Sequence, residues 1–467
     1  MLSLYNTLHH QKENFIPCKK RGGLFGGRPR IGIYTCGPTV YNYAHLGNLR
    51  AYVVSDLLKR VLIDNGYRLR HIMNITDVGH LTSDADEGED KLEKGARREG
   101  KTAWEVADFY IRAFKNDLRL LNIQPPDKYC RATDHIREQI KLVKQLIAKG
   151  VTYTTNDGIY FDTTKIHHYG QLANLENQEL KAGARVGLGE KKNPHDFALW
   201  KFSPATAKRQ MEWKAFGHLG FPGWHLECSA MAMKYLGEQF DIHCGGIDHI
   251  PVHHTNEIAQ SETATGKKPW VKYWLHNEFL VTDKEKMAKS GDNFLTLAYL
   301  QKQGINPLAY RYFLLQTHYR KQQHFSLEAV KAAQAGWERM TALAAQLRQN
   351  KNPANREKIR AFQEQFHTHI NDDLDIPQAL ALTWEYLNNH DLDFATLKKA
   401  DRIFGLNLGQ SKVGPTKLDN EIRKLIKQRQ EARQKKNWTE SDHLRQELEN
   451  KGYRVEDTPD GQIVEKK

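Results

Sequence analysis

Apolar and polar positions follow their clearest pattern near the N-terminus, where they predict a strand, a helix and a second strand in succession. Residues 31–35 form an apolar run of strand character that breaks at Cys36-Gly37-Pro38. Apolar positions then recur at helical spacing over residues 46–65, and residues 68–76 again have strand character. This succession predicts a βαβ unit, which implies a parallel sheet with a right-handed crossover.

The middle of the chain departs from this rhythm. Polar residues dominate 77–101, which we expect to form a loop, and residues 102–122 have the pattern of a long amphipathic helix. A further helix is predicted for 135–149, and the alternation over 151–163 around Asn-Asp-Gly predicts a β-hairpin. We therefore interpret residues 124–215 as an insertion into the sheet domain.

Strand and helix patterns return after the insertion and then give way to helices alone. A helix is predicted after Trp224, a strand near 241–243, a helix from about Val252 and a strand-like stretch over 273–281. From residue 306 onward the pattern is almost entirely helical.

The end of the chain has the composition of a linker followed by a small domain. Residues 409–417 are rich in glycine and polar residues, and residues 418–467 predict two charged helices and a hairpin. The whole pattern predicts an α/β fold. It comprises a Rossmann-type parallel-sheet domain with an insertion, an α-helical bundle and a small C-terminal α+β domain.

Composition narrows the class of protein. No run approaches the roughly 18 consecutive apolar residues of a membrane span, and the N-terminus lacks a signal layout, so we expect a cytoplasmic protein without membrane contact. The net charge of +13 favours a polyanion such as nucleic acid as partner, although many soluble proteins are moderately basic. The five cysteines are odd in number and irregularly spaced, which favours metal binding or catalysis over disulfides.

The stretch of residues 31–50 has the layout of a nucleotide-phosphate site. A strand ends in small residues and leads into a helix N-terminus, where free N–H groups and the helix dipole favour anions. Glycine lets a ligand approach the backbone. Cys36 and His45 in this stretch are not part of a simple phosphate cradle.

A second group of residues has the chemistry of a metal site. His253 and Glu257 share one face of a helix at a spacing of four. Together with Cys36 and Cys228 they offer two thiolates, one imidazole and one carboxylate, which suits four-coordinate Zn²⁺. Buried structural thiols beside a surface His/Glu pair are the alternative. Other possible ligands are His225, His243, Cys244 and His254.

Two further motifs are weak alone. Lys286 and Lys289 place two ammonium groups on a short loop, which suits a reacting triphosphate, but a solvated basic loop would look the same. Gly245-Gly246 permits close backbone approach and Asp248 can accept hydrogen bonds from ribose hydroxyls.

Together, in this order and spacing, these segments are specific. The chain resembles the class I aminoacyl-tRNA synthetases, and within them the cysteinyl-tRNA synthetase family, from about residue 2 to the C-terminus. The segments that carry the resemblance are CGPTVYNYAHLGN (36–48), NITD (74–77), PGWHLECSAM (222–231), DIHCGGIDHIPVHHTNEIAQSE (241–262), KMAKS (286–290) and EDTPDG (456–461).

The resemblance implies catalytic roles for two signature motifs. HLGN stands at the family's HIGH signature, so His45 is expected to contact the ATP phosphates, with Asn48 in place of the final histidine. KMAKS stands at the KMSKS signature with Ala288 replacing serine, and Lys286 and Lys289 keep the phosphate-stabilising role.

The resemblance also implies binding sites for Zn²⁺ (one per chain), ATP and Mg²⁺. The implied nucleotide-binding residues are Gly37, Pro38, His45, Asn48, Gly245, Gly246, Asp248 and Lys289. The implied zinc ligands are Cys36, Cys228, His253 and Glu257. Thr76 and Trp224 are expected to be walls of the amino-acid pocket, and the implied anticodon contacts are Arg433, Trp438, Asp442 and Asp457.

The implied function is activation of L-cysteine by ATP and transfer of the cysteinyl group to cysteine tRNA, by a monomer. Since a shaped apolar pocket separates near-isosteres only weakly, we expect zinc to select the substrate thiol and to make an editing domain unnecessary. The expected domains are 1–123 and 216–275 (catalytic halves), 124–215 (insertion), 276–325 (lysine loop and stem-contact region), 326–408 (tRNA-binding bundle) and 418–467 (anticodon recognition).

Two other functions would require part of the same set of motifs. A ligase that passes the cysteinyl-adenylate to a small amine would share the catalytic motifs, but it would not need the C-terminal helices, Trp438 or EDTPDG. A non-catalytic RNA-binding protein with a structural zinc would not need His45 or the two lysines of KMAKS.

Overall fold

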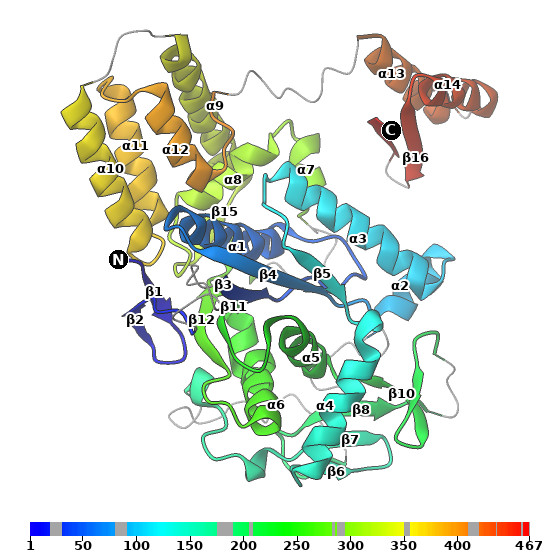
Figure 1. Cartoon of the computed structure of the whole chain (residues 1–467). Helices are drawn as coiled ribbons and strands as arrows, with labels where there is room; N and C mark the ends of the chain where they lie inside the picture. The colour runs from blue at the N-terminus through cyan, green and yellow to red at the C-terminus, as the bar shows by residue number, and fades with distance from the viewer. Residues whose placement is uncertain are drawn as a thin grey trace. The chain divides into compact units, whose positions relative to one another are not determined.

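The computed structural model describes residues 1–18, 30–79, 91–174, 190–204, 209–282, 285–286, 295–349, 355–409, 420–435, 437–458 and 461–466. The chain divides into two compact units, Met1–Gly409 and Gln410–Lys467. Figure 1 shows the elements of both units. Within the described parts, no helix combines the length and apolar character that crossing a bilayer requires.

A five-stranded parallel sheet with the order β12-β11-β3-β4-β5 forms the centre of the first unit. The predicted strand–helix–strand unit is confirmed by β3 and β4, which pair in parallel with Ile33 opposite His71. The strands are β3 (Arg30–Thr35), β4 (Arg68–Ile75), β5 (Lys128–Arg131), β11 (Phe240–Gly246) and β12 (Val271–Asn277).

Helices cover both faces of this sheet, as alternating strands and helices of parallel sheets require. Figure 1 shows α1 (Leu46–Asp64) and α3 (Ala103–Leu120) on one face, and α5 (Trp224–Leu236) and α6 (Thr255–Thr265) on the other. The chain leaves β3 toward β4 through α1, and it leaves β11 toward β12, in the opposite direction, through α6. Strands β3 and β11 therefore flank a topological switch point, where ligands bind outside the carboxyl ends of the strands.

An antiparallel sheet with the order β6-β7-β8-β10-β9 makes up most of the insertion. Strands β6 (Thr152–Thr154) and β7 (Gly158–Phe161) confirm the predicted hairpin. Strand β5 belongs to the parallel sheet, and β10 (His218–Pro222) belongs to the antiparallel one, so the sheet boundaries differ from residues 124 and 215. The remaining elements are β8 (Phe197–Phe202), β9 (Trp213–Ala215) and α4 (Ile136–Ala148).

The segment expected to be a loop, residues 77–101, contains a helix, so that expectation was wrong for its second half. Helix α2 (Lys91–Glu99) buries Leu92 and Ala96. The apolar face of α2 consists of only these two residues, which is too few to give a recognisable helical pattern in a polar segment. Residues 80–90 lie outside the described part of the chain.

A three-stranded sheet and a run of helices follow the parallel sheet. Strand β13 (Leu280–Thr282) lies between β14 (Glu285–Lys286) and β15 (Gln323–Phe325). The helices of this region are α7 (Leu297–Lys302), α8 (Pro307–Leu315), α9 (Leu327–Gln349), α10 (Arg356–Asn371), α11 (Ile376–Asn388) and α12 (Phe394–Phe404). The largely helical character expected beyond residue 306 is thus confirmed. The hairpin β1 (Ser3–Asn6) and β2 (Gln11–Asn14) opens the chain.

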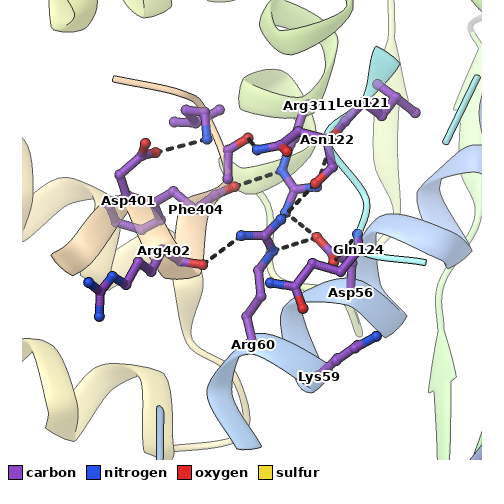
Figure 2. A network of polar contacts seen from close by, with 12 residues as sticks. Asp56, Lys59, Arg60, Leu121, Asn122, Gln124, Arg311, Asp401, Arg402 and Phe404 are labelled. Atoms are coloured by element: carbon purple, nitrogen blue, oxygen red, sulfur yellow. Dashed lines mark hydrogen bonds and ion pairs between the residues drawn. The ribbon is translucent and has the colours of Figure 1, made fainter. Parts of the chain in front are cut away.

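A buried polar network fastens α1 to the helical region, as Figure 2 shows. The Asp56 carboxylate accepts hydrogen bonds from Arg60 Nε at 2.7 Å and Arg311 Nη2 at 2.6 Å. Arg311 Nε also donates to the carbonyl of Phe404 in α12 at 2.6 Å. The C-terminal half of α1 is therefore joined to α8 and α12 by charged groups that are satisfied inside the protein.

The second unit has its own small core. Helices α13 (Asn420–Gln434) and α14 (Trp438–Asn450) pack with the hairpin β16 (Tyr453–Thr458) and β17 (Gly461–Lys466). The buried apolar residues are Ile422, Leu425, Leu444, Leu448 and Val455. The two helices and the hairpin confirm the prediction for the tail.

Candidate active site

One cavity lies at the carboxyl edge of the parallel sheet, at the switch point between β3 and β11. It is lined by residues from five parts of the chain: 35–52, helix α3 (Tyr110 and Phe114), Trp224, 245–249 and 277–280. Among the predicted site residues, it is lined by Cys36, Gly37, Pro38, His45, Asn48, Trp224, Gly245, Gly246 and Asp248.

The N-terminus of α1 forms one side of this cavity, and His45 caps it. His45 Nδ1 accepts the backbone N–H of Asn48 at 3.1 Å, and Asn48 Oδ1 accepts the N–H of His45 at 3.3 Å. Because Nδ1 is an acceptor, a neutral His45 carries its proton on Nε2. Asn48 therefore takes part in the capping box that orients His45.

Backbone hydrogen bonds hold the described residues on either side of residues 287–294. On one side, the backbone of Lys286 pairs with Val281 of β13. On the other, the carbonyl of Leu295 accepts the N–H of Leu46 at 2.8 Å. Lys289 and the side chain of Lys286 lie outside the described part of the structure, so their predicted roles stay predictions.

The turn after β3 has no room for a side chain at Gly37. A Cβ there would lie 1.7 Å from the carbonyl oxygen of Asn74, whose side chain accepts the Gly37 N–H at 2.7 Å. Thr76, expected to be a pocket wall, is not among the residues that line the cavity and is 1% exposed. Its N–H donates to the carbonyl of Pro38 at 3.0 Å, which joins the end of β4 to this turn. The expected role of Thr76 in the amino-acid pocket stays a prediction.

Gly245 and Gly246 keep the end of β11 open to the cavity. A Cβ on Gly245 would lie 2.5 Å from His254 Cε1, and one on Gly246 would lie 2.3 Å from Asp248 Oδ1. Asp248 itself is exposed at the cavity. The backbone can therefore be approached closely here, beside a carboxylate.

The four predicted zinc ligands come together behind the cavity. Cys36 follows β3, Cys228 lies in α5, His253 lies in the π-helical turn η7 (Ile250–His254), and Glu257 lies in α6. Their ligand atoms all lie within 4.8 Å of one another, and all four residues are buried. His253 Nε2 and Glu257 Oε1 are 2.8 Å apart.

Three more buried imidazoles stand behind these residues. His225 Nδ1 lies 2.9 Å from His253 Nδ1, and His243 Nε2 lies 3.0 Å from Glu257 Oε2. His254 Nε2 lies 3.4 Å from Cys36 Sγ. These histidines were alternative ligands in the sequence, and a second close group does form from Cys36, His243, His254 and Glu257. Cys244 is in neither group.

Burial and mutual contact shift the pKa values of the set strongly. Burial raises the pKa of Glu257, but His243 and His253 outweigh it and lower the pKa to about 2. Burial lowers the pKa of His253, but Glu257 and Cys228 raise it to about 10. A hydrogen bond with Cys36 lowers the pKa of Cys228, whereas burial raises that of Cys36.

The residues present fit a zinc ion. A tetrahedral ion with bonds of about 2.0–2.3 Å holds its ligand atoms about 3.3–3.8 Å apart, so the observed spread needs only a small contraction. Two thiols, an imidazole and a carboxylate suit this borderline-soft ion. Buried imidazoles that hold the ligands from behind are typical of metal centres.

His249 also lines the cavity, and the sequence reading missed it. Its ring centroid lies 5.3 Å from that of His253 and 5.0 Å from that of His254. Burial lowers its pKa to about 4, so the imidazole is neutral at physiological pH. Its place directly after Asp248 in the GGIDH segment was the available signal.

The predicted anticodon residues lie in the second unit. Asp457 is paired with Arg429 at 2.8 Å and Arg433 at 2.9 Å, with Arg445 at 3.6 Å. Trp438 is 56% exposed, and the guanidinium of Arg433 lies 6.0 Å from its ring. Asp442 is exposed on α14. The structure brings three of the four residues together.

Comparison with known proteins agrees with this site. Residues 26–335 match the family described as the tRNA synthetases class I (C) catalytic domain. Residues 416–464 match the cysteinyl-tRNA ligase anticodon binding domain. The parallel sheet, the cavity at its switch point and the first match define a class I aminoacyl-tRNA synthetase.

Curated relatives narrow the class further. The chain is 48% identical over 466 residues to cysteine–tRNA ligase 1 of Burkholderia lata, covering 99% of this chain and 96% of the relative. It is 44% identical to the cysteine–tRNA ligase of Treponema denticola, covering 98% of each chain. The chain belongs to the cysteinyl-tRNA synthetase family.

Solved structures of other class I synthetases share the fold at low sequence identity. A Mycobacterium tuberculosis methionyl-tRNA synthetase in complex with methionyl-adenylate matches with a TM-score of 0.57 at 12% identity, covering 85% of this chain and 94% of that chain. A leucyl-tRNA synthetase of Agrobacterium radiobacter matches with a TM-score of 0.56 at 12% identity, covering 83% and 84%.

Proposed function

We propose that this chain activates L-cysteine with Mg-ATP to cysteinyl-adenylate and transfers the cysteinyl group to the 3′ end of cysteine tRNA. One observation carries the proposal. A single cavity is lined by Cys36, from the close Cys/Cys/His/Glu group, and by His45 and Asn48 at the N-terminus of α1. In this proposal, the metal-binding group that takes the substrate thiol and the α1 N-terminus that binds the phosphates therefore line the same cavity.

The chain's own groups account for the ATP half of the reaction. Helix N–H groups and the Nε2–H of His45 stabilise the negative charge that develops on the phosphates. Gly37, Pro38, Gly245 and Gly246 let the nucleotide approach the backbone, and Asp248 accepts the ribose hydroxyls. Lys286 and Lys289 would stabilise the leaving pyrophosphate. Catalysis is then chiefly positioning and charge stabilisation.

The other half of the cavity holds the amino acid. Trp224 forms a wall beside Cys36. Zinc bound by Cys36, Cys228, His253 and Glu257 would bind the substrate as a thiolate, which the harder hydroxyl of serine does not match. Discrimination between cysteine and serine thus does not depend on a difference in the shape of their side chains.

The C-terminal unit serves tRNA in this proposal. Its match to an anticodon-binding domain and its exposed Trp438, beside Arg433, supply a stacking face and a cation. Asp442 and Asp457 complete the proposed contacts, and the bundle of residues 326–408 contacts the tRNA as well. We expect the enzyme to act as a monomer in the cytoplasm.

Cysteine-dependent exchange of pyrophosphate into ATP, followed by charging of cysteine tRNA, tests the function. Exchange with cysteine but not serine, together with charging, is the expected result. Exchange without charging would indicate a ligase with a small-molecule acceptor, and neither activity would indicate a binding protein. Lys286→Ala and Lys289→Ala should lower kcat of exchange far more than cysteine affinity.

A further inference from the structure

A buried arginine connects the HLGN helix to the opposite wall of the cavity. Arg50 stands on the core-facing side of α1, only two residues after Asn48, and is 1% exposed. Its Nη1 donates to the carbonyls of Glu278 at 2.9 Å and Phe279 at 2.5 Å. Its Nη2 donates to the carbonyls of Lys321 at 2.6 Å and His318 at 3.4 Å.

These carbonyls belong to two turns that meet beneath the cavity. Residues 277–280, which join β12 to β13, line the cavity together with His45, Gly47 and Asn48. Residues 318–321 follow α8 and support the first turn, because the carbonyl of Tyr319 accepts the N–H of Glu278 at 2.8 Å. Arg50 thus fastens both turns to the helix whose first turn carries HLGN.

The chemistry of this contact is unusual for a buried charge. All the hydrogen bonds that the Arg50 guanidinium makes within the described residues go to backbone carbonyls, and none goes to a carboxylate. Burial lowers its pKa to about 10. A planar fork can serve two turns at once, whereas the single ammonium group of lysine cannot reach all these acceptors. A buried cation held only by carbonyls fixes backbone positions rather than gaining ion-pair energy.

We propose that Arg50 is a positioning residue for the nucleotide: it holds the 277–280 wall against the N-terminus of α1 and so sets the width of the space that takes ATP. The inference rests on the proposed function, because ATP is the ligand of that space. Arg50 touches neither substrate; it acts through the carbonyls of Glu278 and Phe279. The metal-binding group, on the other side of β3, should not be affected.

Arg50→Lys tests this, with Arg311→Lys as the matched control. Arg311 is equally buried and also donates to carbonyls, those of Leu121 and Phe404, but it lies in the network of Figure 2 and not at the cavity. In pyrophosphate exchange, Arg50→Lys should raise the KM for ATP by about tenfold or more and leave the KM for cysteine within about twofold. Arg311→Lys should leave both KM values within about twofold, even if it lowers Tm as much as Arg50→Lys does.

Unchanged KM for ATP in Arg50→Lys, or an equal rise for ATP and cysteine, would overturn the inference. Should Arg50→Lys fold poorly, Arg50→Ala with added methylguanidinium replaces it: recovery of the KM for ATP supports the role, and no recovery in the folded variant contradicts it.

Absence of cysteine-dependent exchange in the unaltered protein would instead count against the proposed function. Calorimetric titration with ATP alone then decides about Arg50. Weaker ATP binding in Arg50→Lys than in Arg311→Lys supports the inference, and equal binding overturns it.

Discussion

His45 and Asn48 hold each other across the first turn of α1: each side chain accepts the backbone N–H of the other residue, at 3.1 and 3.3 Å. This reciprocal contact explains how asparagine can stand where the family signature has histidine. Asn48, at the fourth position of the signature, orients His45, at the first position. The helix N-terminus stays capped. Because Nδ1 accepts a hydrogen bond, the neutral His45 ring keeps its proton on Nε2, which can donate.

Asn48→Ala should therefore affect both the helix and the reaction. Loss of one capping partner should lower the free energy of unfolding by about 0.5–2 kcal/mol. It should also lower kcat of pyrophosphate exchange by about 10–100-fold, because His45 loses its fixed orientation. Urea unfolding and exchange kinetics measure the two effects. Asn48→Gln keeps an accepting amide oxygen at this position and serves as control; a large loss of kcat in this variant as well would show that capping is not what position 48 contributes.

His225 should control zinc affinity through His253. Its ring holds Nδ1 of His253 at 2.9 Å, which fixes the tautomer that presents Nε2 to the metal-binding group. We expect His225→Phe to weaken zinc binding by about 10–100-fold, measured by competition with a chromophoric chelator. His135→Phe removes another buried imidazole, one bonded to Arg131 and Tyr235, and should leave zinc affinity unchanged. Equal affinity in the two variants would contradict the positioning role.

Asp56 should carry much of the stability of the contact between α1 and the helical region. Asp56→Asn leaves the buried Arg60 and Arg311 without their carboxylate, which should cost about 3–5 kcal/mol of unfolding free energy. Glu364→Gln breaks the exposed pair with Arg360 and should cost less than about 1 kcal/mol. Urea unfolding of both variants compares them. Similar losses would mean that the network of Figure 2 is not a stabilising contact.

His71 should make stability fall in acid. It is buried in β4, with Nε2 3.0 Å from Thr35 Oγ1, and burial, with a smaller contribution from Lys59, lowers its pKa to about 3. The unfolded chain takes up a proton at about pH 6.5, so between about pH 6.5 and pH 3 the unfolded state binds more protons and stability is lost as pH falls.

In His71→Gln the free energy of unfolding should therefore depend less steeply on pH. The difference in slope within that window should approach about 1.4 kcal/mol per pH unit, the value for one proton. Urea unfolding at several pH values measures it. Parallel curves for the two proteins would exclude His71 as the titrating group.

The sequence predicted the parallel sheet because the period of apolar positions changes from strand to helix and back within one βαβ unit. It missed α2, whose apolar stripe is too short, and it placed β5 outside the sheet because four residues carry too little pattern. Cys36, Cys228, His253 and Glu257 could be grouped by their ligand chemistry. Only the fold shows that His225 contacts His253 and that His243 contacts Glu257.

Charged residues on the buried face of α1 were a signal that went unused. Arg50, Asp56 and Arg60 share that face with Leu49, Val53 and Leu57, where a charge must find a partner. Their partners come from residues more than 200 positions away in several cases, such as Glu278 and Arg311. Only the folded chain could identify them.

Binding of the substrate sulfur to the metal is the central claim, and cobalt in place of zinc makes it visible. Thiolate bound to Co²⁺ absorbs in the near ultraviolet by charge transfer from sulfur, above the contribution of Cys36 and Cys228. Titration of the cobalt-loaded protein with L-cysteine should add a further increment that saturates at one equivalent, and L-serine should add none. No increment with cysteine, or the same increment with serine, would contradict selection of the substrate by its thiol.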